Sequence, residues 1–212
     1  AEDGIRDHCV TGVQTCALPI YRGMPMKSLP FLLIPFLLAG GSAWGVPFRD
    51  TLRQQNVTFA VNATDEGSIQ LLQVKAHKGL HTYLPVKQEL IGRVVGAEAK
   101  DLNGDGQPEL VVIVQSAGSG RYGGVQAWTA GAGRSLLTIT LPDLSANLAE
   151  GYRGYNTFQV LEGGLERSFP IHRAGDPLGE ASGGKRVIFY TLAAGEGGWT
   201  FQPTRVTTVP AP

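Results

Sequence analysis

The sequence predicts an all-β protein, an antiparallel β-sandwich or barrel of about eight or nine short strands. No segment long enough for an ordinary helix has a helical hydrophobic period, and the nearest approach is the short stretch from Asp143 to Ala149. Short apolar or alternating runs recur instead at intervals of about ten residues. Turns rich in glycine, which makes up 29 of the 212 residues, separate these runs.

The candidates for these strands share alternating polar and apolar residues or a short β-branched run. In the first half of the chain they are 56–61, 68–76, 90–95, 110–114 and 125–128. In the second half they are 136–141, 156–162, 165–172, 186–192 and 199–201. Gly163-Gly164 indicates a tight two-residue hairpin between two of them.

The stretch 101–128 is the centre of this arrangement. An acidic, glycine-punctuated loop leads into the apolar run 110–114, whose β-branched residues favour a buried strand. A loop of small residues follows, then Arg121 and Tyr122, and then a returning strand. These features predict a hairpin that presents its tip. The candidate functional residues are therefore Ser119, Gly120, Arg121 and Tyr122.

The first 20 residues are excluded from this reasoning. AEDGIRD and, after two residues, VTGVQTCALPI resemble the translation of a sequencing-library adapter. Both cysteines, Cys9 and Cys16, lie in this segment. No disulfide, thiol catalyst or thiolate metal site is therefore expected in the remainder.

Residues 21–45 have the features of a leader with a secretory signal peptide. Met26-Lys27-Ser28 opens a basic region, an apolar run ends at Ala39, and Ala43-Trp44-Gly45 suits signal cleavage. The apolar run is shorter than the roughly 20 residues of a membrane-spanning helix. We expect a periplasmic or secreted protein without a membrane anchor after cleavage, whose residues 46–212 form a single all-β domain.

Composition and side-chain patterns argue against nucleic-acid binding and against catalysis. The 18 basic and 18 acidic residues balance one another. Ser119 lacks the spacing of a nucleophile elbow, and no pair of carboxylates for glycoside hydrolysis can be identified. Only three histidines, His77, His81 and His172, could serve as a base. His77 and His81 have the spacing of a helical metal site, but Gly79 and Pro85 argue against a helix and favour surface histidines.

The acidic loop has two interpretations. Asp101, Asn103 and Asp105 alternate as in the first half of an EF-hand calcium loop, although Val112 stands at the twelfth position in place of Glu. The pattern is closer to loops of FG-GAP-type β-repeats, with Glu109 as the last carboxylate. A structural Ca²⁺ held by these four residues and a plain turn closed by Asp and Asn side chains both remain open. No cofactor is required for the expected function.

Ser119-Gly120-Arg121-Tyr122 resembles the SGxY signature of the periplasmic inhibitors of invertebrate-type lysozyme. The order of the flanking segments is similar too: a signal peptide, the DLNGDGxPEL strand, the SGxY loop, LERSFP at 165–170 and GGKR at 183–186. The resemblance covers about residues 97–200, whereas 46–96 carries no matching motif.

This resemblance implies an exported lysozyme inhibitor whose Ser119–Tyr122 loop enters the active-site cleft of the enzyme. The alternative is a calcium-stabilised, exported β-rich binding or surface module that has no enzyme target.

Overall fold

The computed structural model of the chain describes residues 47–64, 67–195 and 197–211. The chain divides into two units, Ala1–Gly41 and Ser42–Pro212, and every described residue lies in the second. The predictions made for residues 1–20 and 21–45 fall outside the described residues. Within the part that is described, no helix is long and apolar enough to cross a membrane.

The all-β class is confirmed, since the described residues form thirteen strands and no helix. A five-stranded sheet consists of β1 (Phe48–Gln54), β2 (Val57–Ala63), β3 (Ile69–Lys78), β4 (His81–Thr82) and β5 (Val86–Ile91). An eight-stranded sheet consists of β6 (Arg93–Lys100), β7 (Glu109–Gln115), β8 (Gly123–Thr129), β9 (Leu137–Thr140), β10 (Thr157–Leu161), β11 (Gly164–Pro170), β12 (Lys185–Gly195) and β13 (Gly198–Val209).

All seven strands expected from residue 110 onward are present, and the additional strands lie before residue 101. The expected strand 90–95 is divided between β5 and β6 at Gly92. This glycine has a φ of +119°, and a Cβ there would lie 2.6 Å from the Gln115 carbonyl oxygen. The chain turns at this point because only glycine fits both constraints.

β7 is the central strand of the fold and is buried on both faces. Leu110, Val112 and Val114 face a core shared with the five-stranded sheet, where Phe59 and Leu72 are fully buried. Val111 faces a second core, together with the buried residues Leu165, Phe169, Ile188, Tyr190 and Phe201. A strand that separates two cores needs an uninterrupted apolar run, which is what residues 110–114 provide.

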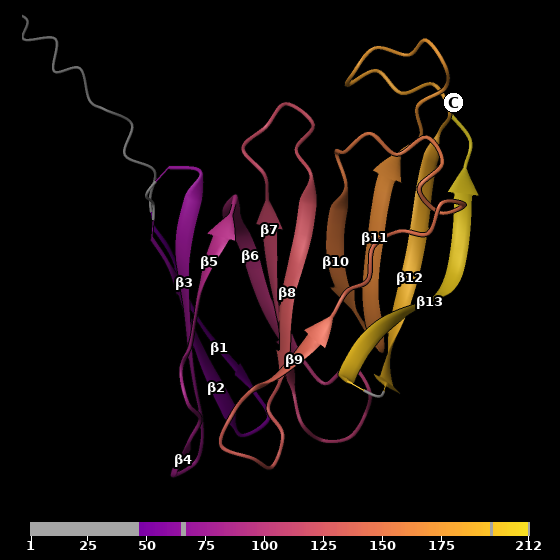
Figure 1. Ribbon diagram of the computed structural model, residues 1–212. Helices are drawn as coiled ribbons and strands as arrows, with labels where there is room; N and C mark the ends of the chain where they lie inside the picture. Colours follow the sequence, from indigo (N-terminus) through magenta and orange to yellow (C-terminus); the bar gives the residue numbers. More distant parts are fainter. Residues whose placement is uncertain (1–46, 65–66, 196, 212) are drawn as a thin grey trace, which may run out of the picture. The chain divides into compact units, whose positions relative to one another are not determined.

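The eight-stranded sheet folds back over itself. Its strand order is β10-β11-β12-β13-β9-β8-β7-β6. Neighbouring strands are antiparallel except for β13 and β9. These two strands run parallel and pair over only two positions, Trp199 with Ile139 and Thr200 with Thr140. Beyond this junction, β10–β13 cover the face of β7 and β8 that points away from the five-stranded sheet. The described strands therefore form three layers with β6–β8 in the middle (Figure 1).

The hairpin expected at Gly163-Gly164 is present with a different loop. The loop residues are Glu162 and Gly163, and Gly164 is already the first residue of β11, paired with Leu161. A Cβ at Gly164 would lie 2.0 Å from the Tyr190 carbonyl oxygen of β12. The two glycines thus have different roles: Gly163 supplies a φ of +72°, and Gly164 allows close approach of a neighbouring strand.

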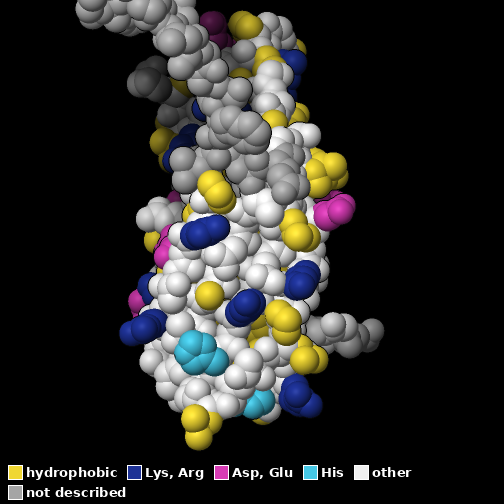
Figure 2. Space-filling view, turned by 90° about the vertical axis from the view of Figure 1, so that its left-hand side faces the viewer, with side chains coloured by type: hydrophobic (Ala, Val, Ile, Leu, Met, Phe, Trp, Pro, Cys, Tyr) yellow, Lys and Arg dark blue, Asp and Glu magenta, His cyan; other side chains and the backbone are white. Residues whose placement is uncertain are grey.

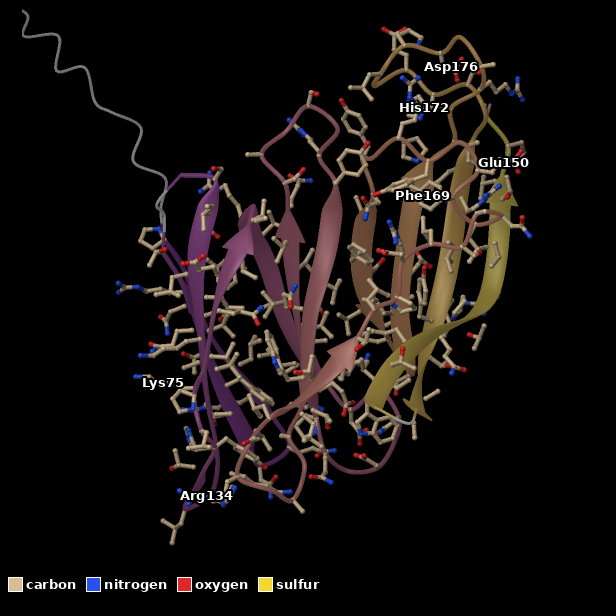
Figure 3. All side chains as sticks on the ribbon, in the orientation of Figure 1. Lys75, Arg134, Glu150, Phe169, His172 and Asp176 are labelled. Atoms are coloured by element: carbon tan, nitrogen blue, oxygen red, sulfur yellow. The ribbon has the colours of Figure 1, made fainter. Side chains whose placement is uncertain are left out.

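The outer face of the five-stranded sheet is mostly polar, although Ile69, Leu71 and Ile91 are exposed where β3 and β5 pair. Its outward positions include Arg49, Arg53, Lys75 and Lys87, on strands whose alternate residues fill the first core. Figure 2 looks onto this side and shows Lys and Arg side chains spread across it. Lys75 points away from the core in Figure 3. One solvated face is typical of antiparallel sheets, so the pattern follows from the strand period.

Three connections meet at one end of the second and third layers. They are the β7–β8 loop, the segment between β9 and β10, and the loop between β11 and β12, all at the top of Figure 1. His172 and Asp176 mark the third connection in Figure 3, above Phe169 in the core. The residues of the predicted tip are therefore at an end built from irregular backbone.

Candidate functional site

The tip loop, Ser116–Tyr122, is closed by hydrogen bonds of its own. The Ser116 N–H donates to the Tyr122 carbonyl oxygen at 2.8 Å, and the Tyr122 N–H donates to the Ser116 Oγ at 2.9 Å. The Arg121 N–H donates to the Gly118 carbonyl oxygen at 3.0 Å. Although the loop is made of small residues, these bonds give its backbone a defined shape.

The four predicted site residues lie together on this loop with different exposures. Ser119 and Arg121 are exposed, Tyr122 is 51% exposed, and Gly120 is buried. A Cβ at Gly120 would lie 2.5 Å from Cε2 of the Tyr122 ring. Gly120 therefore leaves room for the ring, while the Ser119 and Arg121 side chains point to solvent.

Strained backbone is concentrated at this end of the molecule. Three described non-glycine residues have positive φ, and two of them, Arg121 at 42° and Tyr155 at 55°, lie on adjoining segments. The Tyr155 N–H donates to the Gly120 carbonyl oxygen at 2.7 Å. At Gly154 a Cβ would lie 2.0 Å from that same oxygen. Such conformations cost about 1–3 kcal/mol each and are found preferentially at binding and catalytic sites.

Sequence reasoning missed the segment Gly151–Asn156, which supports the tip loop. The Asn156 side chain accepts a hydrogen bond from the Gly123 N–H at 2.8 Å and donates one to the Gly123 carbonyl oxygen at 2.9 Å. The Tyr152 O–H donates to the Asn156 Oδ1 at 2.6 Å. The Tyr152 ring meets the Tyr122 ring edge to face, with 5.7 Å between centroids. Asn156 and Gly123 are 33 positions apart in the chain, so no local sequence pattern predicts their contact.

Beneath these rings lies a nearly buried arginine. The Arg167 guanidinium lies 5.0 Å from the ring centroid of Tyr152, 5.6 Å from that of Phe158 and 5.9 Å from that of Phe169. Only 8% of Arg167 is exposed, and the ring faces supply a favourable electrostatic environment for its charge. Burial raises the pKa of Tyr152 against the opposing effect of Arg167, so this hydroxyl stays protonated and can donate.

The acidic loop is held by its own side chains. Asp101 accepts hydrogen bonds from the Gly104 N–H at 2.8 Å and the Gly106 N–H at 2.9 Å. The Asp105 N–H donates to the Asn103 Oδ1 at 3.0 Å, and the Gln107 N–H donates to the Asp105 Oδ1 at 2.7 Å. Side-chain-to-backbone bonds of this kind stabilise turns without a metal.

Glu109 points inward, unlike the other three residues of the calcium prediction. It is fully buried, and its Oε2 accepts a hydrogen bond from the Leu102 N–H at 2.7 Å. Burial raises the pKa of Glu109 to about 7, with smaller contributions in the same direction from Asp105 and Asp101. Its hydrogen bonds with the Leu102 N–H and the Thr129 side chain lower its pKa, but burial outweighs them.

The described residues contain no group of three or more His, Cys, Asp or Glu placed to hold a metal ion. The predicted calcium site would also use the side chain of Asn103. The carboxylates of Asp101, Asp105 and Glu109 already accept hydrogen bonds from backbone N–H groups. Calcium binding by Asp101, Asn103, Asp105 and Glu109 stays a prediction.

The three described histidines lie on β3, on β4 and in the connection between β11 and β12. His77 and His81 are exposed on β3 and β4, and the pairing places Thr82 opposite His77 and Lys78 opposite His81. His172 is 6% exposed, and neither ring nitrogen has a hydrogen-bond partner among the described residues.

Comparison with known proteins gives a family match, and it includes the β7–β8 hairpin. Residues 86–141 match the family of the periplasmic lysozyme inhibitor of I-type lysozyme. The expected resemblance to this family is confirmed over that range. A search of curated proteins found no match.

The matched range differs from the one expected from the motifs. It begins at residue 86, in β5, and so includes residues before 97 that carry no recognisable motif. It contains the acidic loop, β7, the tip loop and β8, and it ends at residue 141, before LERSFP and GGKR. The match covers about a quarter of the chain. The matched family consists of inhibitors described as periplasmic.

Proposed function

We propose that this chain is an exported, non-enzymatic inhibitor of lysozyme, of the invertebrate type, and that its Ser119–Tyr122 loop enters the active-site cleft of the enzyme. The observation that carries the proposal is the position of this loop. It is the exposed turn of the β7–β8 hairpin, inside the range that matches the inhibitor family. The signal-peptide features of residues 21–45 support export to the periplasm.

The chemistry of the loop suits such a target. A lysozyme cleft contains two carboxyl groups, one a proton donor and the other ionised. The Ser119 and Tyr122 hydroxyls can donate hydrogen bonds to carboxylate oxygens, and Arg121 can pair with an acidic group at the rim. Tyr122 also offers a large, rigid contact surface of the kind that dominates binding energy at interfaces.

Replacing Tyr122 tests the proposal. Tyr122→Ala should weaken inhibition by about thirtyfold or more, equivalent to about 2 kcal/mol of binding. Its free energy of unfolding should change by less than about 1 kcal/mol, because half of the ring is already exposed. The measurements are inhibition of bacterial cell lysis by invertebrate-type, chicken-type and goose-type lysozymes, and denaturant unfolding.

Leu80→Ala is the matched control. Leu80 is fully exposed in the turn between β3 and β4, at the opposite end of the strands from the tip loop (Figure 1). This variant should inhibit as the unsubstituted protein does. Undiminished inhibition by Tyr122→Ala would refute insertion of the loop.

If the chain is instead a calcium-stabilised module without an enzyme target, the same assays should give a different result. No lysozyme would be inhibited, and chelation with EGTA would lower the unfolding midpoint because a ligand of the native state stabilises it by mass action. Asp105→Ala would then abolish the effect of EGTA. A structural calcium ion is also compatible with inhibition, so the lysis assay decides between the two functions.

A further inference from the structure

We propose that Tyr152 and Asn156 are positioning residues that hold the tip loop in its binding conformation. This inference rests on the proposed function of Ser119–Tyr122. We call the pair the clamp. Neither residue belongs to the motifs of the sequence, and both lie beyond the range that matches the inhibitor family.

Asn156 fixes the base of the tip loop by acting as a substitute for a neighbouring strand. Its side chain bonds both the N–H and the carbonyl oxygen of Gly123, the first residue of β8 and the one that follows Tyr122. The backbone of a paired strand would satisfy the same two groups. Asn156 is 2% exposed, so water does not compete effectively for these bonds.

Tyr152 connects this base to the ring at the tip. Its O–H donates to the Asn156 Oδ1 at 2.6 Å, so that this oxygen accepts from both Gly123 and Tyr152 and both of its acceptor sites are used. The Tyr152 ring supports the Tyr122 ring at an interplanar angle of 88°. It rests in turn on Phe169, with 4.7 Å between centroids, and on Arg167. A continuous stack thus runs from the second core to the exposed ring.

The consequence for binding is a smaller entropic cost. A tyrosine that is free to rotate on a loop loses conformational entropy when a cleft closes around it, and this loss weakens binding. A ring that is already supported from one side, on a loop already bonded at its base, loses less. The clamp therefore acts on binding through Tyr122.

The test compares two tyrosine hydroxyls, one in the clamp and one in the first core. Tyr152→Phe removes the hydroxyl that donates to Asn156 and keeps the ring. Tyr83→Phe removes a buried hydroxyl that donates to the Gly131 carbonyl oxygen at 3.0 Å, and serves as the matched control. The readouts are backbone ¹⁵N order parameters for residues 118–124, the inhibition constant against invertebrate-type lysozyme and the unfolding midpoint, all with the full chain.

Tyr152→Phe should weaken inhibition about fivefold, the equivalent of one hydrogen bond. The order parameters of Arg121, Tyr122 and Gly123 should fall from about 0.85 toward 0.6. Tyr83→Phe should leave both the order parameters and the inhibition constant unchanged. Tyr152→Leu, which also removes the ring that supports Tyr122, should weaken inhibition further than Tyr152→Phe does.

Unchanged order parameters in Tyr152→Phe would overturn the clamp, and so would a loosened tip loop with unchanged inhibition. Failure of the unsubstituted protein to inhibit any lysozyme would overturn the proposed function, and with it the role of the clamp in inhibition. The order parameters do not depend on lysozyme, so they still show in that case whether Tyr152 and Asn156 order the tip loop.

Discussion

Glu109 is the residue in which the sequence motif and the physical environment differ most. The motif presents it as the last oxygen ligand of an acidic loop, yet the carboxyl group is buried at the start of the central strand. Desolvation disfavours its charged form and raises its pKa from 4.5 to about 7. The native state therefore binds a proton at pH values where an unfolded chain has released it.

This difference predicts a pH dependence of stability. Between about pH 4.5 and 7 the native state holds more protons than the unfolded state, so the contribution of Glu109 to stability falls as the pH rises. The loss should be complete above pH 7 and amount to about 1–3 kcal/mol. It is measured as the difference in free energy of unfolding between the unsubstituted protein and Glu109→Gln, in EGTA, across this range.

Glu109→Gln is close to isosteric and keeps an oxygen that can accept from the Leu102 N–H. Its stability should lack this component of the pH profile, while other titrating groups contribute equally to both proteins. Parallel profiles for the two proteins would show that Glu109 has an ordinary pKa.

At the scale of single elements, two neighbouring glycines in the hairpin between β10 and β11 have different structural roles. Gly163→Asn should change the free energy of unfolding by less than about 0.5 kcal/mol, because asparagine tolerates a positive φ and a Cβ there meets nothing within 4 Å. Gly164→Ala should cost more than about 2 kcal/mol, since its Cβ would collide with the backbone of β12. Denaturant unfolding of both variants measures the contrast. Equal costs would contradict the assignment of turn and close approach to these two positions.

The elements that the sequence predicts well are those whose environment follows from local pattern. The apolar run 110–114 indicates a buried strand, and β7 is indeed buried between two cores. β1 was missed because FRDTLRQ places only Phe48 and Leu52 toward the first core and otherwise reads as polar. An edge strand buries so little that its period is hard to detect.

The candidate site likewise has one part that the sequence predicts and one part that it does not. The tip loop is a local feature, with small residues between two strands, and its position could be predicted. The clamp depends on side chains that bond to backbone far along the chain, and on a sheet that folds back on itself. Neither the Asn156–Gly123 bonds nor the contact between the Tyr152 and Tyr122 rings has a sequence signature, because both arise only when the segment before β10 comes to lie beside the tip loop and β8.

At the scale of the whole molecule, we propose that residues 46–212 fold without the segments before them. Deletion of residues 1–45 should leave the unfolding midpoint unchanged, because the residues that the structure describes already form two cores. Thermal unfolding of the full and shortened chains measures this. A clear loss of stability on deletion would show that residues 1–45 contribute to the fold.

The parallel junction of β9 and β13 has a consequence for the order in which the molecule can assemble. β13 lies between β9 and β12, so the two halves of the eight-stranded sheet are joined only through a strand made after both of them. Until β13 pairs, β12 and β9 each have one unpaired edge, and unpaired edges template association with other chains. The pairing of β13 with β9 also links positions about 60 residues apart, which slows closure. Arrival of this one strand therefore ends the period in which the nascent protein is most open to aggregation.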